Sequence, residues 1–261
     1  MQLFPRAAGL YILTLFFVMT ILIGGACSPL RETRSITVFA AASLQEPLTD
    51  ITEKYSALNN IDVYLNLGGS LALANQIARG APADVFISAG VNPTAKIRAE
   101  NMVAPHNVVS WLTNEIVLVA GAPNGFVNRG IETVLGKTVA VADPERAPAG
   151  RYAKECLETF GLWNQMEYSV IRSANVRSAL VSVETGAADL AFVYRTDLLL
   201  SDAVEVVFPC PKGSHTFIEY LVSLIGRDQQ AEYGANFIEF LNTEYVKGIM
   251  RRYGFIVIEQ P

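Results

Sequence analysis

Four short stretches of the chain place small residues where an expected strand ends and an expected helix begins. Ser43 follows the run Ala40–Ala42 in ITVFAAASLQEPL. Ser70 follows two glycines in LGGSLALANQ, Ala149 stands between a proline and a glycine in ERAPAGRYAKE, and Val176 follows an asparagine in SANVRSAL. The first N–H groups of a helix lack intrahelical partners and carry partial positive charge. Together with the serine hydroxyls, four such helix starts could bind an anion without any Lys or Arg.

Each helix start also has a purely structural interpretation. SLQE fits the capping box, with Glu46 three residues after Ser43, so Ser43 taken alone is expected to be an N-cap. Ser70 repeats this arrangement, and Asn175 is expected to cap the helix that begins at Val176. The four helix starts together indicate an anion site. Each follows the carboxyl end of an expected strand, which is where ligands of open α/β sheets bind. The alanine run would then leave space for a compact ligand close to the backbone.

Strand-like and helix-like segments alternate between residues 35 and 258, which is typical of βαβ units and mainly parallel sheets. The expected strands are 35–41, 61–67, 83–89, 115–120, 137–143, 167–173, 188–195, 204–209, 217–226 and 255–258. The expected helices are 44–58, 71–80, 93–101, 149–161, 176–186, 231–243 and 244–254.

Two long apolar strands, at 115–120 and 217–226, bracket the middle of the chain. If both strands cross between lobes, lobe 1 consists of 35–114 plus 223–261 and lobe 2 of 115–222. A ligand cleft then lies between the lobes, with a two-strand hinge. A single sheet is the alternative that the pattern alone leaves open.

The ordered segments ITVFAAASL, LALANQIARGAPADVFISA, VADPERAPAGRYAKECL, NVRSAL, FVYRTD and RRYGF resemble the periplasmic molybdate-binding proteins of ABC importers. The resemblance covers nearly all of residues 35–256. It implies the two-lobed α/β fold of type II periplasmic binding proteins, in which helices flank a mainly parallel sheet in each lobe. It also implies an oxyanion site of neutral donors, namely the hydroxyl and amide of Ser43 and of Ser70, the amides of Ala149 and Val176, and the hydroxyl of Tyr194. The chain departs from the family at NLGGSLA, where Gly68, Gly69 and Leu71 replace small and hydroxyl residues.

Such a site supplies donors and no acceptor, so it favours a fully deprotonated tetrahedral dianion. The resemblance implies molybdate or tungstate as the ligand, no cofactor, and no residue that binds a metal cation directly. It also implies a monomer that delivers the ion to the membrane permease of an ABC importer. Sulfate or another small oxyanion is the alternative ligand, since only cavity size would exclude it.

An alternative of another class is a serine hydrolase. GGSLA at 68–72 partly matches the G-x-S-x-G pattern, with Ala72 in place of the second glycine. The histidines of the chain, His106 and His215, stand in the loop-like contexts APHNV and KGSHT. An enzyme is therefore not expected.

The N-terminal segment resembles a bacterial lipoprotein signal peptide over residues 1–26. Arg6 precedes a long apolar stretch, and GGAC places a small residue before Cys27, the expected lipidated residue. A polar tether would cover 27–34. The chain is then expected outside the cytoplasm, in the periplasm or on the outer face of the cell membrane, held by a lipid anchor. An uncleaved membrane anchor is the alternative.

Charge and cysteine content narrow the remaining possibilities. The net charge of −5 argues against nucleic acid, which requires a basic surface. Cys156 and Cys210 could form a disulfide in an oxidising compartment, or remain two free buried thiols. The chain has no CxxC and only two histidines, so a zinc site is not expected.

Overall fold

The computed structural model describes residues 34–103, 107–123, 129–166, 168–225 and 229–259. All of the helices and strands below belong to one compact unit, Ser35–Pro261. The expected signal peptide, the lipidated Cys27 and His106 lie outside the described residues. Within the described ranges, no helix combines the length and the apolar character that a membrane crossing requires.

The first sheet has the strand order β11-β4-β10-β3-β1-β2 within the described residues. Its strands are β1 (Ser35–Ala41), β2 (Asp62–Gly68), β3 (Val85–Ala89), β4 (Val108–Thr113), β10 (Glu219–Leu224) and β11 (Ile256–Val257). Strand β1 pairs in parallel with both β2 and β3, whereas β10 runs antiparallel between β3 and β4. The sheet is therefore mixed, and less parallel than the alternation of elements predicts.

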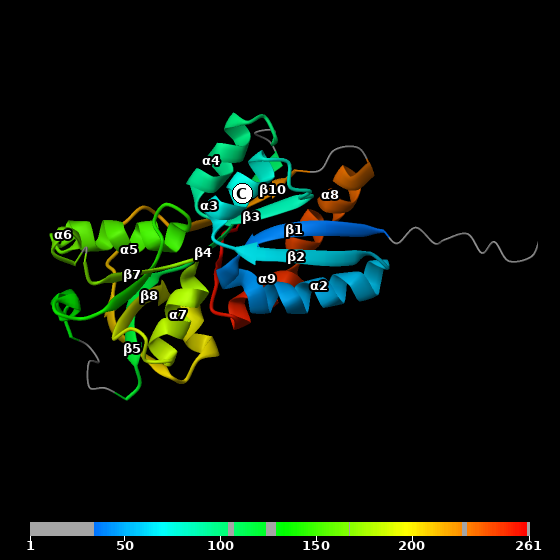
Figure 1. Cartoon of the computed structure of the whole chain (residues 1–261). Helices are drawn as coiled ribbons and strands as arrows, with labels where there is room; N and C mark the ends of the chain where they lie inside the picture. The colour runs from blue at the N-terminus through cyan, green and yellow to red at the C-terminus, as the bar shows by residue number, and fades with distance from the viewer. Residues whose placement is uncertain (1–33, 104–106, 124–128, 167, 226–228, 260–261) are drawn as a thin grey trace, which may run out of the picture. The chain divides into compact units, whose positions relative to one another are not determined.

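Helices cover both faces of the first sheet (Figure 1). They are α2 (Gln45–Asn59), α3 (Ser70–Ala78), α4 (Val91–Ala99), α8 (Gln229–Leu241) and α9 (Glu244–Arg252), with a 3-10 turn η1 (Ala42–Leu44) before α2. Strand β1 shows why both faces are buried, since its side chains alternate between two apolar clusters. Phe39 packs with residues of α3 and α4, while Val38 packs in the cluster that contains Leu48 and Ile51 of α2.

The second sheet has the order β7-β6-β8-β5-β9 among the described residues. Its strands are β5 (Ile116–Gly121), β6 (Val139–Ala142), β7 (Val170–Ser173), β8 (Leu190–Tyr194) and β9 (Val204–Pro209). The helical segments of this lobe are η3 (Ile131–Val134), α5 (Pro148–Thr159), α6 (Trp163–Met166), α7 (Val176–Glu184) and η4 (Arg195–Leu200). Strands β6, β7 and β8 are parallel, and β5 is antiparallel to both of its neighbours. Helices α5 and α7 cover opposite faces of this sheet (Figure 1).

The chain passes between the two sheets in short connecting segments and not within strands. Strand β4 of the first sheet ends at Thr113, and β5 of the second begins at Ile116. The return runs from Pro209, at the end of β9, to Glu219, at the start of β10. Each of the two strands expected to cross therefore belongs to one sheet. Strand β4 was not expected from the sequence, because its pairing with β10 and β11 is non-local.

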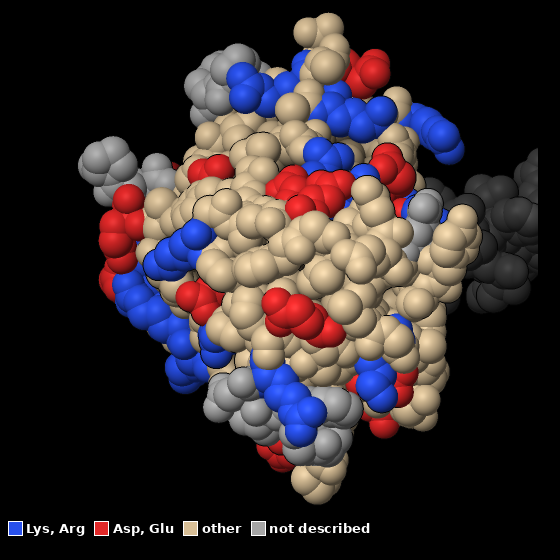
Figure 2. Space-filling model, turned by 90° about the vertical axis from the view of Figure 1, so that its left-hand side faces the viewer, with Lys and Arg blue, Asp and Glu red and all other residues tan. Residues whose placement is uncertain are grey.

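A face of the second lobe carries charges of both signs. Lys and Arg side chains are interspersed with Asp and Glu across the face that Figure 2 shows, and uncharged residues separate them. This mixed surface is the usual solvated exterior of a folded domain.

A disulfide joins Cys156 of α5 to Cys210, which directly follows β9. Both cysteines are buried, and their Cα atoms lie 6.2 Å apart. Of the two alternatives that the sequence leaves open, the structure has the bonded one. The bond closes a loop with a sequence separation of 54 residues, so it restricts the unfolded chain strongly.

We expect the double substitution Cys156→Ala, Cys210→Ala to lower the free energy of unfolding by about 2–5 kcal/mol, measured by denaturant titration. A reducing agent should lower the stability of the natural chain by a similar amount and leave the double variant unchanged. Equal unfolding midpoints for the natural chain with and without reductant would contradict the prediction.

Candidate functional site

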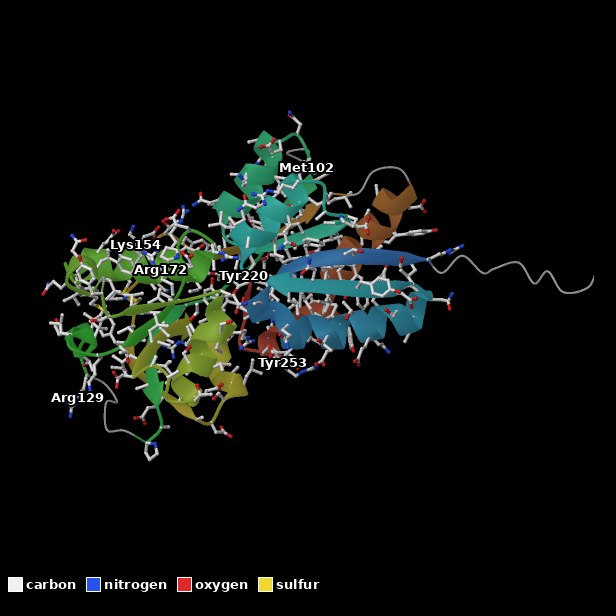
Figure 3. The ribbon with its side chains drawn as sticks, in the orientation of Figure 1. Met102, Arg129, Lys154, Arg172, Tyr220 and Tyr253 are labelled. Atoms are coloured by element: carbon white, nitrogen blue, oxygen red, sulfur yellow. A yellow bond between two sulfur atoms is a disulfide. The ribbon has the colours of Figure 1, made fainter. Side chains whose placement is uncertain are left out.

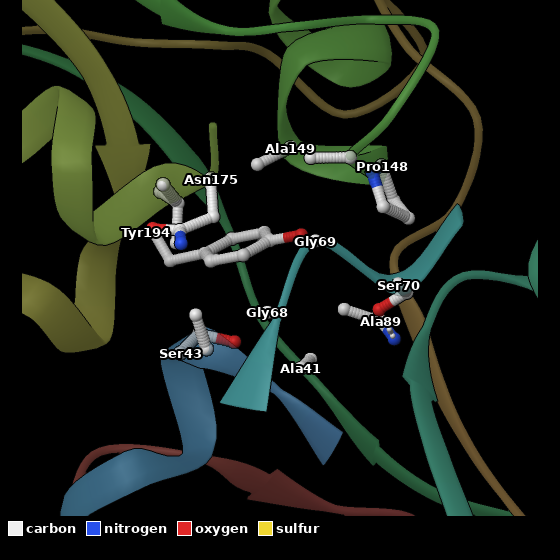
Figure 4. Close-up of a pocket in the computed structure, with 13 residues that line it drawn as sticks. Ala41, Ser43, Gly68, Gly69, Ser70, Ala89, Pro148, Ala149, Asn175 and Tyr194 are labelled. Carbon is white, nitrogen blue, oxygen red and sulfur yellow. Dashed lines mark hydrogen bonds between the residues drawn. The ribbon is translucent and has the colours of Figure 1, made fainter. Parts of the chain in front are cut away.

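A pocket between the two sheets contains every residue that the sequence proposes as an oxyanion ligand. Its lining residues are Ala41, Ala42, Ser43, Gly68, Gly69, Ser70, Ala89, Ala147, Pro148, Ala149, Asn175, Val176 and Tyr194 (Figure 4). The cavity between these residues has a volume of about 10 Å³, which is roughly the space of one water-sized sphere. Only a small ligand suits such a site.

The pocket lies where strands of both sheets end. Ala41, Gly68 and Ala89 are the last residues of β1, β2 and β3, and Tyr194 is the last residue of β8. Helix starts that follow β6 and β7 supply Ala149 and the neighbouring residues of the second lobe. Ligands of α/β sheets bind at such strand ends, because the helix N-termini point toward them.

Ser43 is not an N-cap, contrary to the capping box predicted from SLQE. It lies within η1, the N-cap position of α2 is Leu44, and no side chain caps that helix. The Ser43 hydroxyl instead lies 2.9 Å from the hydroxyl of Tyr220. Tyr220 stands 177 positions further along the chain, so a local sequence pattern could not reveal this partner.

Ser70 also differs from its predicted capping role. It is the first residue of α3, and Gly69 occupies the N-cap position. The Ser70 Oγ accepts a hydrogen bond of 3.1 Å from the backbone N–H of Ala89. The serine oxygen is therefore engaged as an acceptor, and its own O–H remains available to the pocket.

In the second lobe, Ala149 offers a backbone amide to the pocket. Proline has no N–H, and the Gly150 N–H bonds to the Ala147 carbonyl at 3.1 Å, so Ala149 carries the available donor of this helix start. A side chain at Gly150 would lie 1.7 Å from the Ala142 carbonyl oxygen. Only glycine permits this close approach of α5 to the end of β6.

Val176 begins α7, and Asn175 caps the helix as the sequence predicts. The Asn175 Oδ1 accepts the Ser178 N–H at 3.0 Å. The Val176 N–H belongs to the first turn of the helix, where amides lack intrahelical partners, and it borders the pocket.

Tyr194 carries a buried hydroxyl that has no hydrogen-bond partner within the described residues. Figure 4 shows its ring extending into the space between Ser43, Ser70 and Ala149. Burial raises the pKa of Tyr194 well above its usual value, so the phenol stays protonated and can donate. An unpaired buried hydroxyl is costly, and an anion in the pocket would satisfy it.

The two lobes contact each other across the pocket. The Ala72 N–H in α3 donates to the Arg146 carbonyl of the second lobe at 3.1 Å. A side chain at Gly69 would lie 2.8 Å from the Arg146 carbonyl oxygen and 3.0 Å from that of Ala174. Backbone meets backbone here, so the structure is a closed arrangement that depends on glycine at this position.

An ion pair connects the lobes beside the pocket. Arg177 Nη2 of α7 lies 2.5 Å from Glu46 Oε2 of α2, and Arg177 Nη1 lies 2.6 Å from Asp197 Oδ1. Asp197 also accepts the backbone N–H of Tyr194 at 2.8 Å. Burial raises the pKa of Asp197 to about 6, although the positive charge of Arg177 lowers it. Glu46, predicted to complete a capping box, therefore forms a contact between lobes instead.

The pocket has no charged side chain among its lining residues in the described part of the chain. His215 does not line this pocket. Its Nδ1 lies 2.8 Å from the Thr216 carbonyl oxygen, and its ring packs near Tyr152. No group of three His, Cys, Asp or Glu side chains that could hold a metal ion occurs in the described ranges. The site is thus a set of neutral donors, suited to binding an anion.

The chain belongs to the bacterial extracellular solute-binding protein family, whose sequence pattern matches residues 36–256. The molybdate-binding protein ModA of Escherichia coli (strain K12) is 35% identical over 242 residues, which cover 89% of this chain and 93% of that protein. A Bacillus subtilis (strain 168) protein described as "Putative ABC transporter substrate-binding lipoprotein YvgL" is 32% identical over 243 residues, covering 90% of this chain and 93% of its own.

Solved structures of similar fold include two oxyanion-binding proteins. The periplasmic molybdate-binding protein of Azotobacter vinelandii has a TM-score of 0.76 at 20% identity, covering 86% of this chain and 100% of its own. The sulfate-binding protein SubI of Mycobacterium tuberculosis H37Rv has a TM-score of 0.75 at 17% identity, covering 87% and 88%. These likenesses confirm the expected two-lobed α/β fold of periplasmic binding proteins. Family membership confirms the expectation of a solute-binding protein and not an enzyme.

We expect Gly69→Ala to weaken the affinity for molybdate, used as a probe oxyanion, by at least about tenfold, because the lobes could no longer approach fully. A tenfold loss corresponds to about 1.4 kcal/mol. The three atoms nearest to the added methyl group belong to the second lobe, so the thermal stability of the ligand-free protein should change little.

Gly248→Ala is the matched control, because a methyl group at Gly248 in α9 meets nothing within 4 Å. Its affinity should equal that of the natural chain. Unchanged affinity in Gly69→Ala would show that closure does not require the backbone contact.

Proposed function

We propose that this chain captures molybdate outside the cytoplasm for an ABC importer, and that it binds tungstate as well. The observation that carries the proposal is the pocket of neutral donors, in which the Tyr194 hydroxyl is buried without a partner. The 35% sequence identity between this chain and the molybdate-binding protein of Escherichia coli supports molybdate as the ligand.

The proposed ligands of the ion are the hydroxyl and amide of Ser43 and of Ser70, the amides of Ala149 and Val176, and the hydroxyl of Tyr194. A hydrogen bond to a charged partner contributes roughly 1.5–3 kcal/mol, so several converging donors can replace the water around a dianion. Molybdate and tungstate are tetrahedral and nearly equal in size, so this donor set should hold either ion.

Sulfate is the second candidate, because the sulfate-binding protein SubI matches this fold as well as a molybdate-binding protein does. The fold therefore does not distinguish the two ions. Sulfate has the same shape and charge as molybdate but is smaller, so cavity size decides between them.

We also propose a lipid anchor at Cys27, a monomeric state and delivery of the ion to a membrane permease. The lipoprotein-like motif before Cys27 supports the anchor, and so does the description of the Bacillus subtilis relative as a lipoprotein. The family description places such proteins outside the cell, and the disulfide agrees with an oxidising compartment.

Titration calorimetry of the chain from Ser28 onward tests the ligand. We expect molybdate and tungstate to bind at one ion per chain, with sulfate weaker by at least about tenfold, or 1.4 kcal/mol. Sulfate binding as tight as molybdate binding would favour the second candidate. No heat with any of these ions would contradict an oxyanion site altogether.

We expect Tyr194→Phe to weaken molybdate binding by about 10- to 150-fold, the equivalent of one hydrogen bond to an anion. Its thermal stability without ligand should be unchanged or higher, since the substitution removes an unpaired buried hydroxyl.

Tyr55→Phe is the control for this experiment. Tyr55 also has a buried hydroxyl without a partner among the described residues, but it packs against Phe237 away from the pocket. Its affinity for molybdate should match that of the natural chain. Equal affinity in Tyr194→Phe would remove Tyr194 from the proposed site.

A further inference from the structure

We propose that Tyr220 and Asn114 are positioning residues that fix the Ser43 hydroxyl as a donor toward the bound anion. The inference rests on the proposed oxyanion function and deepens it, because it explains how the site rejects anions that carry a proton. Neither residue lines the pocket, so both would act through Ser43.

The three side chains form a buried series of hydrogen bonds. The Ser43 Oγ lies 2.9 Å from the Tyr220 hydroxyl, which lies 3.5 Å from the Asn114 Nδ2. All three residues are buried, with Tyr220 fully enclosed on β10. Figure 3 shows Tyr220 where the first sheet meets the second lobe.

The orientation of the Asn114 amide determines the direction of the series. The Asn114 Oδ1 accepts the Glu115 backbone N–H at 2.9 Å, so its Nδ2 must be the atom that faces Tyr220. An amide nitrogen can only donate. The Tyr220 oxygen therefore accepts a hydrogen bond from the Asn114 Nδ2.

The Ser43 Oγ lies 2.9 Å from the Tyr220 hydroxyl and can accept the Tyr220 O–H. If the Tyr220 oxygen accepted hydrogen bonds from both Asn114 and Ser43, its own buried O–H would lose the Ser43 acceptor, which is unfavourable. Burial also raises the pKa of Tyr220, so the phenol keeps its proton. With its oxygen occupied by the Tyr220 proton, Ser43 has its own proton free for the pocket.

Ser70 reaches the same state by a simpler route. The Ala89 backbone N–H donates to the Ser70 Oγ, and a backbone N–H cannot accept. Both serines of the first lobe are therefore set as donors by groups of the protein. A protonated anion such as hydrogen phosphate would bring an O–H that neither serine oxygen can accept, whereas a fully deprotonated dianion uses both serine donors.

The series also reaches the second lobe. The Asn114 Nδ2 donates to the Thr196 Oγ1 at 2.9 Å, and Thr196 lies in η4, directly after β8. Asn114 itself stands between β4 and β5, where the chain passes from one sheet to the other. Asn114 therefore links Tyr220 of the first lobe to Thr196 of the second, and the orientation of the Ser43 hydroxyl depends on both contacts.

A double-mutant cycle tests the proposal. The dissociation constant of molybdate is measured for Tyr220→Phe, Ser43→Ala and the combined variant. We expect Tyr220→Phe alone to weaken binding by about 2- to 12-fold, as for a neutral hydrogen bond. In the Ser43→Ala background it should have less than about a twofold effect, because its target is gone.

Equal effects of Tyr220→Phe in both backgrounds would overturn the proposal, since a merely structural role does not depend on Ser43. Tyr55→Phe serves as the control and should leave binding unchanged in both. If Tyr220→Phe does not fold, as judged by thermal unfolding, Asn114→Ala takes its place in the cycle with the same expectation.

Competition with inorganic phosphate gives a second readout. In Tyr220→Phe the Ser43 hydroxyl can rotate and accept a hydrogen bond from the O–H of the phosphate. Phosphate should therefore displace molybdate more readily from Tyr220→Phe than from Tyr55→Phe, at a pH where phosphate carries a proton. An unchanged ratio of molybdate to phosphate affinity would count against the proposal. If the natural chain binds no oxyanion, the proposed function fails as well. If it binds molybdate but the effects of Tyr220→Phe and Ser43→Ala are additive, only the positioning role is overturned.

Discussion

The structure depends on hydrogen-bond donors that are buried without an acceptor of their own. Helix starts and hydroxyls converge between two sheets, and no charged side chain lines the space they enclose within the described residues. The Tyr194 hydroxyl has no partner among the described residues, although a buried unpaired donor is costly. An anion bound in the pocket would offset this cost. A small dianion, which has acceptors on every side, fits that requirement.

The contact between lobes follows from the same requirement, because donors on two sheets must reach one ion. Glycine at position 69 allows two backbones to meet, and Arg177 connects Glu46 of one lobe with Asp197 of the other. Asp197 also holds the Tyr194 amide. Closure and the positions of the donors are therefore coupled through a few contacts between the lobes.

Much of the fold could be predicted from local patterns. The alternation of strands and helices placed most elements, since buried strands such as β8 are continuous apolar runs with clear ends. The pattern missed β4, and it placed the two passages between lobes within strands, whereas the chain crosses in the segments 114–115 and 210–218. Mixed sheets arise because β5 and β10 run against their neighbours, and strand direction depends on pairing with distant segments.

The sequence by itself determined which helix starts carry small residues and bare amides, because those features are local. The resemblance to molybdate-binding proteins supplied the five proposed ligands, and all five line the pocket. Local patterns could not predict the hydrogen bonds of Ser43 and Ser70, and they indicated helix N-caps at both positions. Tertiary structure alone decided that Tyr220 and the Ala89 amide would engage the two serine oxygens. A hydroxyl can donate or accept, so its role is set by neighbours that only folding brings within 3 Å or so.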